Sequence, residues 1–240
     1  DEKKVGELVK KIEKELNCEV TEAHVKEFNP DSDPMFVYEG GSPGIKVKAE
    51  ELKQSLVKAL EAENLKSELK IPVTETQPKT TVEDVKKQTV KLSEYTTYST
   101  NTENGTHNMA LSLAAANGTV LKPGEIFSFN ETTGDTTTGA LGYLPATGIS
   151  NNKSVQVYGG GICQSSTTIY GAALRADMEI VTRYNHRWPS SYVPIGQDAT
   201  VDYPSTDFQF KNSSDYPVYI KAYMDGRTLV VQIYGHPSDE

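Results

Sequence analysis

A cysteine that follows three glycines is the feature of this sequence that points most directly to chemistry, in the run Gly159-Gly160-Gly161-Ile162-Cys163-Gln164-Ser165. Consecutive glycines are expected where the backbone takes unusual angles or approaches a ligand closely. The apolar positions after Cys163 predict a helix that continues to about Asp177. Cys163 would then lie at a helix N-terminus, where free amides and the helix dipole favour a thiolate and an oxyanion. We therefore predict that Cys163 is a nucleophile and that its neighbours contact substrate: Gly160, Gly161, Gln164 and Ser165.

A thiol nucleophile needs a base, and His186 is the best candidate among the four histidines. It follows a predicted strand, Glu179 to Thr182, which returns along the sheet after the helix of Cys163. Asp198 or Asp202 could orient its imidazole, and we choose Asp198 for the catalytic set. Alternative readings stay open, because a cysteine before a helix is more often a buried structural residue. An aspartate beside a strand is likewise more often a turn or cap residue.

The elements that would position these residues lie in the second part of the chain. A helix is predicted from about Thr106 to Ala116, and a strand from Ile126 to Phe129, with loops dominating from there to about Lys153. The C-terminal region is predicted to be β, with a hairpin turn at Asp225-Gly226. Its predicted strands are Ala199 to Tyr203, Phe208 to Lys211, Val218 to Tyr223 and Leu229 to Tyr234.

The first part of the chain has a different character. Residues 1–88 hold 15 of the 24 Lys and Arg residues, whereas residues 89–240 hold 12 of the 13 tyrosines and the single tryptophan. Helical periodicity predicts helices over residues 3–16 and from Ala49 to about Glu63. Strands are predicted at Glu19 to Phe28, Met35 to Tyr38, Ile45 to Lys48 and Leu69 to Val73. A proline and a capping-box pattern place the domain boundary between Thr76 and Thr89.

Together these patterns predict an α+β fold. A small α/β domain would span residues 1–88, and residues 89–240 would form a mixed-sheet catalytic domain with packed helices and a C-terminal antiparallel β region. The net charge of -9 argues against nucleic acid as a partner. The chain begins Asp1-Glu2-Lys3-Lys4 without the apolar core of a signal peptide. We therefore expect a trimmed or mature form, with any membrane anchor upstream.

The second part of the chain resembles the VanW domain family, from about Thr100 to Gly235. The resemblance rests on ordered motifs: Pro123-Gly124-Glu125, Phe127-Ser128-Phe129-Asn130, Gly142-Tyr143, the glycine and cysteine run, Arg183, His186, Tyr192-Val193-Pro194, Asp198-Ala199-Thr200-Val201 and Ile233-Tyr234-Gly235. The first part is similar to the peptidoglycan-binding domain that often precedes VanW domains. Gly44-Ile45-Lys46-Val47 and Ile71-Pro72-Val73 carry that second, weaker likeness.

The resemblance implies an enzyme of the bacterial cell wall that lies outside the cytoplasm, either in the wall or anchored to the membrane on its outer face. Some family members act as L,D-transpeptidases through a cysteine, which corresponds to Cys163 here. The implied partners are peptidoglycan stem peptides. Arg183 is then a candidate for holding a stem carboxylate, and Tyr143 and Tyr192 for lining the donor cleft. No metal and no organic cofactor is suggested.

Two other classes of function stay open at this stage. The same cysteine could serve a hydrolase or carboxypeptidase, in which water takes the acyl group. Alternatively, the protein could be a wall-binding module without chemistry, in which the cysteine is structural. A cysteine at a glycine-rich helix start favours the enzymes, because a pure binding module has no need of it.

Overall fold

The computed structural model describes residues 2–63, 68–150 and 153–238 and has the predicted α+β fold. Its chain divides into two compact units. The first comprises residues 1–26 and 37–85, and the second comprises residues 27–36 and 86–240. In the part of the chain that the structure describes, no helix has the length and apolar character needed to cross a membrane.

The first unit is built on two helices and a two-stranded sheet. Helix α1 (Glu2–Leu16) and helix α2 (Ala49–Glu61) confirm the two predicted helices, and their apolar faces share a small core with β3 (Gly44–Val47). Strand β3 pairs antiparallel with β4 (Val73–Thr76). The strand predicted at Leu69 to Val73 is wrong in its position, because β4 only begins at Val73.

A hairpin and a short helix lie where the chain passes between the units. Strand β1 (His24–Phe28) pairs with β2 (Phe36–Glu39), and α3 (Val82–Lys87) begins after Thr81, whose hydroxyl accepts from the Asp84 amide at 3.2 Å. The segment between β1 and β2 belongs to the second unit. Its Phe28 and Phe36 rings pack on Tyr219, with centroids 5.1 Å from that ring in both cases.

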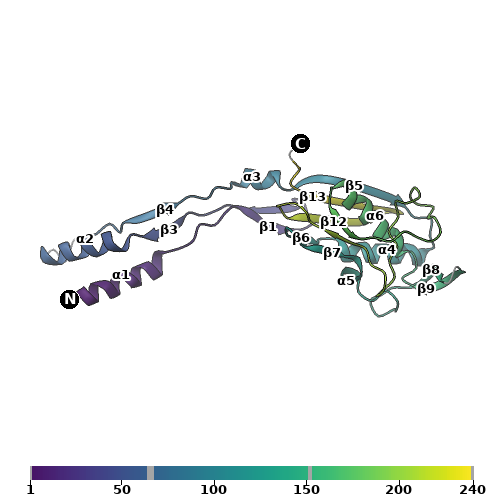
Figure 1. The fold of residues 1–240 in the computed structure, drawn as a ribbon, viewed down its shortest axis with the longest axis horizontal. Coiled ribbons are helices and arrows are strands. Elements are labelled where there is room, and N and C mark those ends of the chain that lie inside the picture. Colours follow the sequence, from purple (N-terminus) through teal and green to yellow (C-terminus); the bar gives the residue numbers. More distant parts are fainter. Residues whose placement is uncertain (1, 64–67, 151–152, 239–240) are drawn as a thin grey trace. The chain divides into compact units, whose positions relative to one another are not determined.

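The second unit contains a four-stranded antiparallel sheet in the order β5-β13-β12-β6 (Figure 1). Its strands are β5 (Val90–Tyr98), β6 (Val120–Leu121), β12 (Val218–Asp225) and β13 (Thr228–Gly235). The hairpin turn predicted at Asp225-Gly226 is confirmed as the β12–β13 connection. Helix α6 (Ile162–Arg175) lies against β5 and β13, and α4 (Glu103–Ala116) lies against β12.

Smaller elements surround this sheet. A three-stranded antiparallel sheet has the order β10-β11-β7, formed by β7 (Ile126–Ser128), β10 (Glu179–Thr182) and β11 (Gln209–Lys211). Helix α5 (Phe129–Thr133) and the hairpin of β8 (Pro145–Ser150) with β9 (Lys153–Tyr158) were not predicted, and neither was the short strand β6. The strand predicted from Ala199 to Tyr203 is wrong, since its only ladder contact is an isolated bridge between Asp202 and Thr206.

Helix α6 is buried along most of its length, although it carries a run of polar residues. Its hydroxyl groups find partners on the neighbouring elements: Thr168 bonds Thr97 of β5 at 2.8 Å, and Ser165 accepts from Ser112 of α4 at 2.8 Å. Ser93 of β5 donates to the carbonyl of Ala172 at 2.8 Å. Because each buried hydroxyl is paired, these bonds fix how the helix sits on the sheet. The position of Cys163 is fixed with it.

Candidate active site

The glycine run forms the tight entry to α6. Gly161 is the residue before the helix and has a φ of +102°, a conformation that is strained for any residue with a side chain. At Gly160 a Cβ atom would lie 2.4 Å from the carbonyl oxygen of Ala146 in β8. The unusual backbone angle expected of the glycines is confirmed at Gly161, and Gly160 allows backbone to pack against backbone at the start of the helix.

The thiol of Cys163 points at the chain segment that follows Asp198. Its Sγ donates to the carbonyl of Val201 at 3.4 Å, and the residue packs against the core while keeping part of its surface exposed. Both cysteines of the chain are free thiols.

Burial is the main cause that raises the pKa of the Cys163 thiol to about 11; backbone hydrogen bonding at Val201 partly offsets it, and the nearby charges of Asp202 and Asp198 add to it. The expectation that the helix N-terminus would favour a thiolate is therefore wrong for the free protein. Desolvation and the two nearby carboxylates both disfavour the charged sulfur. Cys163 is a protonated thiol at neutral pH.

His186 and Asp198 form a closely bonded pair. The ring Nδ1 of His186 lies 2.5 Å from Oδ2 of Asp198, and the His186 backbone amide donates to the same oxygen at 2.6 Å. Burial opposes ionisation of Asp198, but these hydrogen bonds together outweigh it and lower the pKa of its carboxyl group. Asp198 is thus a carboxylate that holds a proton on Nδ1 and turns Nε2 into the basic nitrogen.

The pair is attached to the helix of Cys163 through the residue after Asp198. Ser166 donates to the Ala199 carbonyl at 2.6 Å, and the Ala199 amide donates to the Thr167 hydroxyl at 3.0 Å. The Thr200 amide donates to the carbonyl of Tyr184, two residues before His186, at 2.7 Å. Helix α6, the segment after Asp198 and the loop of His186 are therefore bonded into one neighbourhood.

The catalytic hydrogen bond itself is not made in this state. The sulfur bonds the Val201 carbonyl, and among the described residues Nε2 of His186 has no hydrogen-bond partner. Of the two carboxylates that the sequence left open, Asp198 contacts the imidazole, whereas the Asp202 backbone pairs with Thr206. Catalytic roles for Cys163, His186 and Asp198 stay predictions. They would require the Cys163 sulfur to bond Nε2 of His186 in place of the Val201 carbonyl.

The remaining candidate residues fall into two groups. Gln164 and Ser165 are buried and bonded inward, Gln164 to Thr97 at 3.0 Å. Tyr143 is also buried, which raises the pKa of its hydroxyl to about 12. These three have the surroundings of packing residues, and substrate contact by them stays a prediction. The backbone amide of Gln164 already donates to the Gly161 carbonyl at 3.0 Å, so it is not a free donor for an oxyanion in this state.

Tyr192 and Arg183 contact the elements that carry the reacting groups. Burial is the main cause that raises the pKa of the Tyr192 hydroxyl, and the charge of Cys163 adds to it. Hydrogen bonds link Tyr192 to Thr167 of α6 and to Ser190. Arg183 donates to the Asp198 carbonyl. The sequence analysis did not single out Ser166, Thr167 or Val201. The unbroken run of polar residues from Gln164 to Thr168 was the available signal for the first two, because such a run in a helix that also carries apolar residues indicates buried hydroxyls with hydrogen-bond partners.

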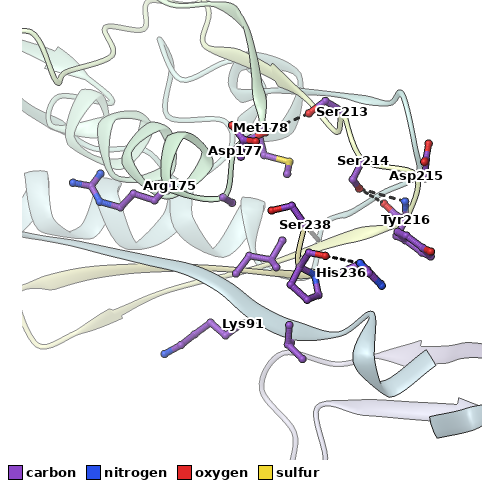
Figure 2. A pocket seen from close by; sticks show the side chains of 14 residues that line it. Lys91, Arg175, Asp177, Met178, Ser213, Ser214, Asp215, Tyr216, His236 and Ser238 are labelled. Atoms are coloured by element: carbon purple, nitrogen blue, oxygen red, sulfur yellow. Dashed lines mark hydrogen bonds between the residues drawn. The ribbon is translucent and has the colours of Figure 1, made fainter. Parts of the chain in front are cut away.

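A separate groove of about 700 Å³ lies at the other end of α6 (Figure 2). It is lined by Lys91, Arg175, Asp177, Tyr216 and His236, among others, and by none of the predicted site residues. Cys163 and Arg175 are separated by about 18 Å along the helix axis, at a rise of about 1.5 Å per residue. This groove is therefore distinct from the thiol site. Among the described residues, no group of His, Cys, Asp and Glu side chains is arranged to hold a metal ion.

The chain belongs to the VanW-like family, because the family model, described as VanW like protein, matches residues 104–234. The matched range contains every candidate site residue and confirms the resemblance seen in the sequence. No solved structure matches the chain.

Two curated proteins are similar to part of the chain. YoaR of Bacillus subtilis is 38% identical over 147 residues, which cover 61% of this chain and 48% of YoaR. The Vancomycin B-type resistance protein VanW of Enterococcus faecalis is 28% identical over 141 residues, covering 55% of this chain and 50% of that protein. The chain thus spans about half the length of the curated relatives it matches.

Proposed function

We propose that this protein is a cell-wall L,D-transpeptidase that works through a thioester on Cys163. One observation carries the proposal. The thiol at the start of α6 faces the chain segment that follows Asp198, and Asp198 is bonded to His186, whose Nε2 has no hydrogen-bond partner among the described residues. A nucleophile, a base and a group that orients the base are the parts that acyl transfer needs. The relative named for vancomycin resistance supports a setting in the cell wall.

In the proposed reaction, the donor is a tetrapeptide stem. His186 Nε2 takes the thiol proton while the sulfur attacks the carbonyl carbon of the third residue. The C–S bond forms, the C–N bond to the terminal D-alanine breaks, and its amine leaves with the proton from His186. An amine on the side chain of another stem then attacks the thioester. A new C–N bond forms, the C–S bond breaks, and the sulfur regains a proton by way of His186.

The buried, protonated thiol adds a requirement to this scheme. The sulfur must leave the Val201 carbonyl and turn to Nε2 before it can react, so the donor stem has to stabilise that arrangement on binding. Apo enzymes often hold catalytic hydrogen bonds in a long or unformed state. The thiolate would then form only with a substrate in place, which protects it from other electrophiles.

The wider setting is also proposed here. We place the protein outside the cytoplasm, at the bacterial cell wall, with stem peptides as its partners and the first unit as a peptidoglycan-binding domain. The family match supports the cell wall through the second unit, whereas the role of the first unit rests on its sequence likeness. Sedimentation of the intact two-unit chain with purified, insoluble peptidoglycan would test the binding role.

The decisive experiment incubates the protein with purified tetrapeptide muropeptides and follows both protein and products by mass spectrometry. We expect a mass increase for a tripeptide acyl group on Cys163, release of D-alanine and a cross-linked dimer. Cys163→Ala should give none of these, while the matched control Cys18→Ala should behave like the unaltered protein, because Cys18 is exposed and lies in the first unit.

The other outcomes separate the alternatives. Tripeptide product without dimer would show a hydrolase or carboxypeptidase. Folded protein that forms no adduct and no product would contradict the enzyme and favour a non-catalytic wall-binding module. Dimer formed equally well by Cys163→Ala would refute the role of this cysteine.

A further inference from the structure

Arg183 contacts the turn from which Asp198 emerges. Its Nε donates to the Asp198 carbonyl at 2.7 Å, and its Nη2 donates to the Gly196 carbonyl at 2.6 Å. The same Nη2 lies 3.5 Å from Oδ1 of Asp198, the carboxylate oxygen that does not face His186. One guanidinium therefore contacts both the backbone and the side chain of the residue that orients the proposed base.

The turn itself is shaped for this contact. The Gln197 amide donates to the Pro194 carbonyl at 3.1 Å, and Gly196 has a φ of +83°, as the third residue of a type II turn requires. Such a turn has little bonding of its own, and its tip residue Ile195 is 83% exposed. The two bonds from Arg183 therefore supply much of what fixes the turn.

Arg183 is itself held against the helix of Cys163. It follows β10 directly, and its guanidinium lies over the ring of Tyr170 in α6, 5.3 Å from the ring centroid. Its side chain is only 23% exposed. The planar fork thus connects the helix that bears the nucleophile with the turn that bears Asp198, a geometry that a lysine cannot reproduce.

We propose that Arg183 is a positioning residue of the proposed transfer reaction: it fixes the Gly196 and Asp198 backbone so that the Asp198 carboxylate keeps the proton of His186 on Nδ1 and leaves Nε2 as the base. The inference rests on the proposed function for its catalytic consequence. Its structural core, the control of the His186 tautomer, can be tested without any turnover. It differs from the expectation that Arg183 holds a stem carboxylate.

The first test reads the ring nitrogens of His186 by nitrogen NMR in the free, full-length protein, with the signal assigned through His186→Gln. The unaltered protein should show the tautomer with hydrogen on Nδ1. Arg183→Gln and Arg183→Lys should both shift the signal toward a mixture of tautomers. Arg175→Gln and Arg175→Lys are matched controls, because Arg175 also lies over a tyrosine ring and donates to a helix carbonyl, at the far end of α6. They should leave the signal unchanged.

The second test measures formation of the Cys163 acyl adduct against muropeptide concentration. We expect a maximal rate roughly 10- to 100-fold lower in both Arg183 variants, because small displacements of catalytic groups cost about that much, with little change in the concentration for half-maximal rate. Lysine should fail to rescue, since the fork and not the charge is needed.

The contrary results are distinct. An unchanged tautomer signal in folded Arg183 variants would overturn the proposal. A half-maximal concentration raised by 10-fold or more at an unchanged maximal rate would also overturn it and assign Arg183 to binding substrate. If the unaltered protein forms no adduct, the proposed function fails, while the NMR result still decides whether Arg183 positions His186.

Discussion

At the scale of single residues, Cys163 and His186 are prepared for chemistry to different degrees. The imidazole already has the hydrogen bond that sets its tautomer, whereas the thiol is bonded to a backbone carbonyl and is protonated. The difference has a simple origin. Asp198 can stabilise a proton on the imidazole, but the same charge disfavours a thiolate close by. Substrate binding must therefore change the state of the sulfur more than that of the base.

This difference predicts how Cys163 reacts in the free protein. In a Cys18→Ala variant, alkylation by iodoacetamide at pH 7 should be roughly 100-fold slower than that of a free cysteine, because a higher pKa leaves less thiolate. The folded pKa is raised, so the rate should keep increasing with pH through 9 and level off only near the value of about 11. Mass spectrometry of the labelled protein measures the rate, with circular dichroism to show that the fold persists. Fast labelling that levels off below pH 8 would contradict the buried resting thiol.

The sequence could identify the candidate residues but not their protonation. Cysteine and histidine are rare in this sequence, and Cys163 follows three consecutive glycines, so both residues could be singled out. Asp198 was one of two reasonable carboxylates. The pKa of the thiol was predicted in the wrong direction because the helix dipole is visible in a sequence, whereas the packing around the sulfur is not. The role of Arg183 was also out of reach, since its partners are backbone carbonyls that no residue type reveals.

At the scale of elements, the helices and strands with a regular spacing of apolar residues were predicted correctly, whereas the irregular segments were not. Helix α6 and the β12–β13 hairpin were predicted because their patterns are strong and local. The segment from Ala199 to Tyr203 was predicted as a strand, but hydrogen bonds with Ser166, Thr167 and Tyr184 satisfy the backbone of Ala199 and Thr200 in place of a ladder. The β8–β9 hairpin was missed because β8 ends a long stretch, from Asn130 to about Lys153, in which Gly, Asn and Thr are frequent and which therefore resembles loops.

The bonds from α6 to Ala199 predict a separation between stability and reactivity. Thr167→Val leaves the buried Ala199 amide without an acceptor, and Thr168→Val breaks the contact of the next residue in the helix with Thr97 of β5. Each should lower the free energy of unfolding by about 1–3 kcal/mol, measured by urea denaturation. Only Thr167→Val should also slow acyl-adduct formation on Cys163, because Thr167 bonds the segment of Asp198 and Thr168 does not. Equal slowing by both variants would show that the effect is general loosening of the helix.

At the scale of the whole molecule, the unit that carries the site is not one continuous stretch of sequence. Residues 27–36 precede the first unit's second helix in the chain and yet belong to the second unit. Phe36 is buried there, with its ring 5.1 Å from Tyr219 of β12 and 5.8 Å from Tyr234 of β13. Asp31 also accepts two hydrogen bonds from the Asn117 side chain, at 3.2 and 3.0 Å. A boundary drawn at one point of the sequence cannot express this arrangement.

Phe36 should therefore stabilise the unit that carries Cys163, although it lies more than 100 positions before that residue. We expect Phe36→Ala to lower the free energy of unfolding of the second unit by about 3–5 kcal/mol, as for other buried aromatic side chains. Urea denaturation followed by near-ultraviolet circular dichroism measures this unit selectively, because residues 89–240 hold 12 of the 13 tyrosines and the single tryptophan. Val37→Ala is the matched control, since the next side chain is 40% exposed and should change stability by less than about 0.5 kcal/mol. If both variants unfold like the unaltered protein, residues 27–36 are only a connection, and residues 86–240 alone should fold with full stability.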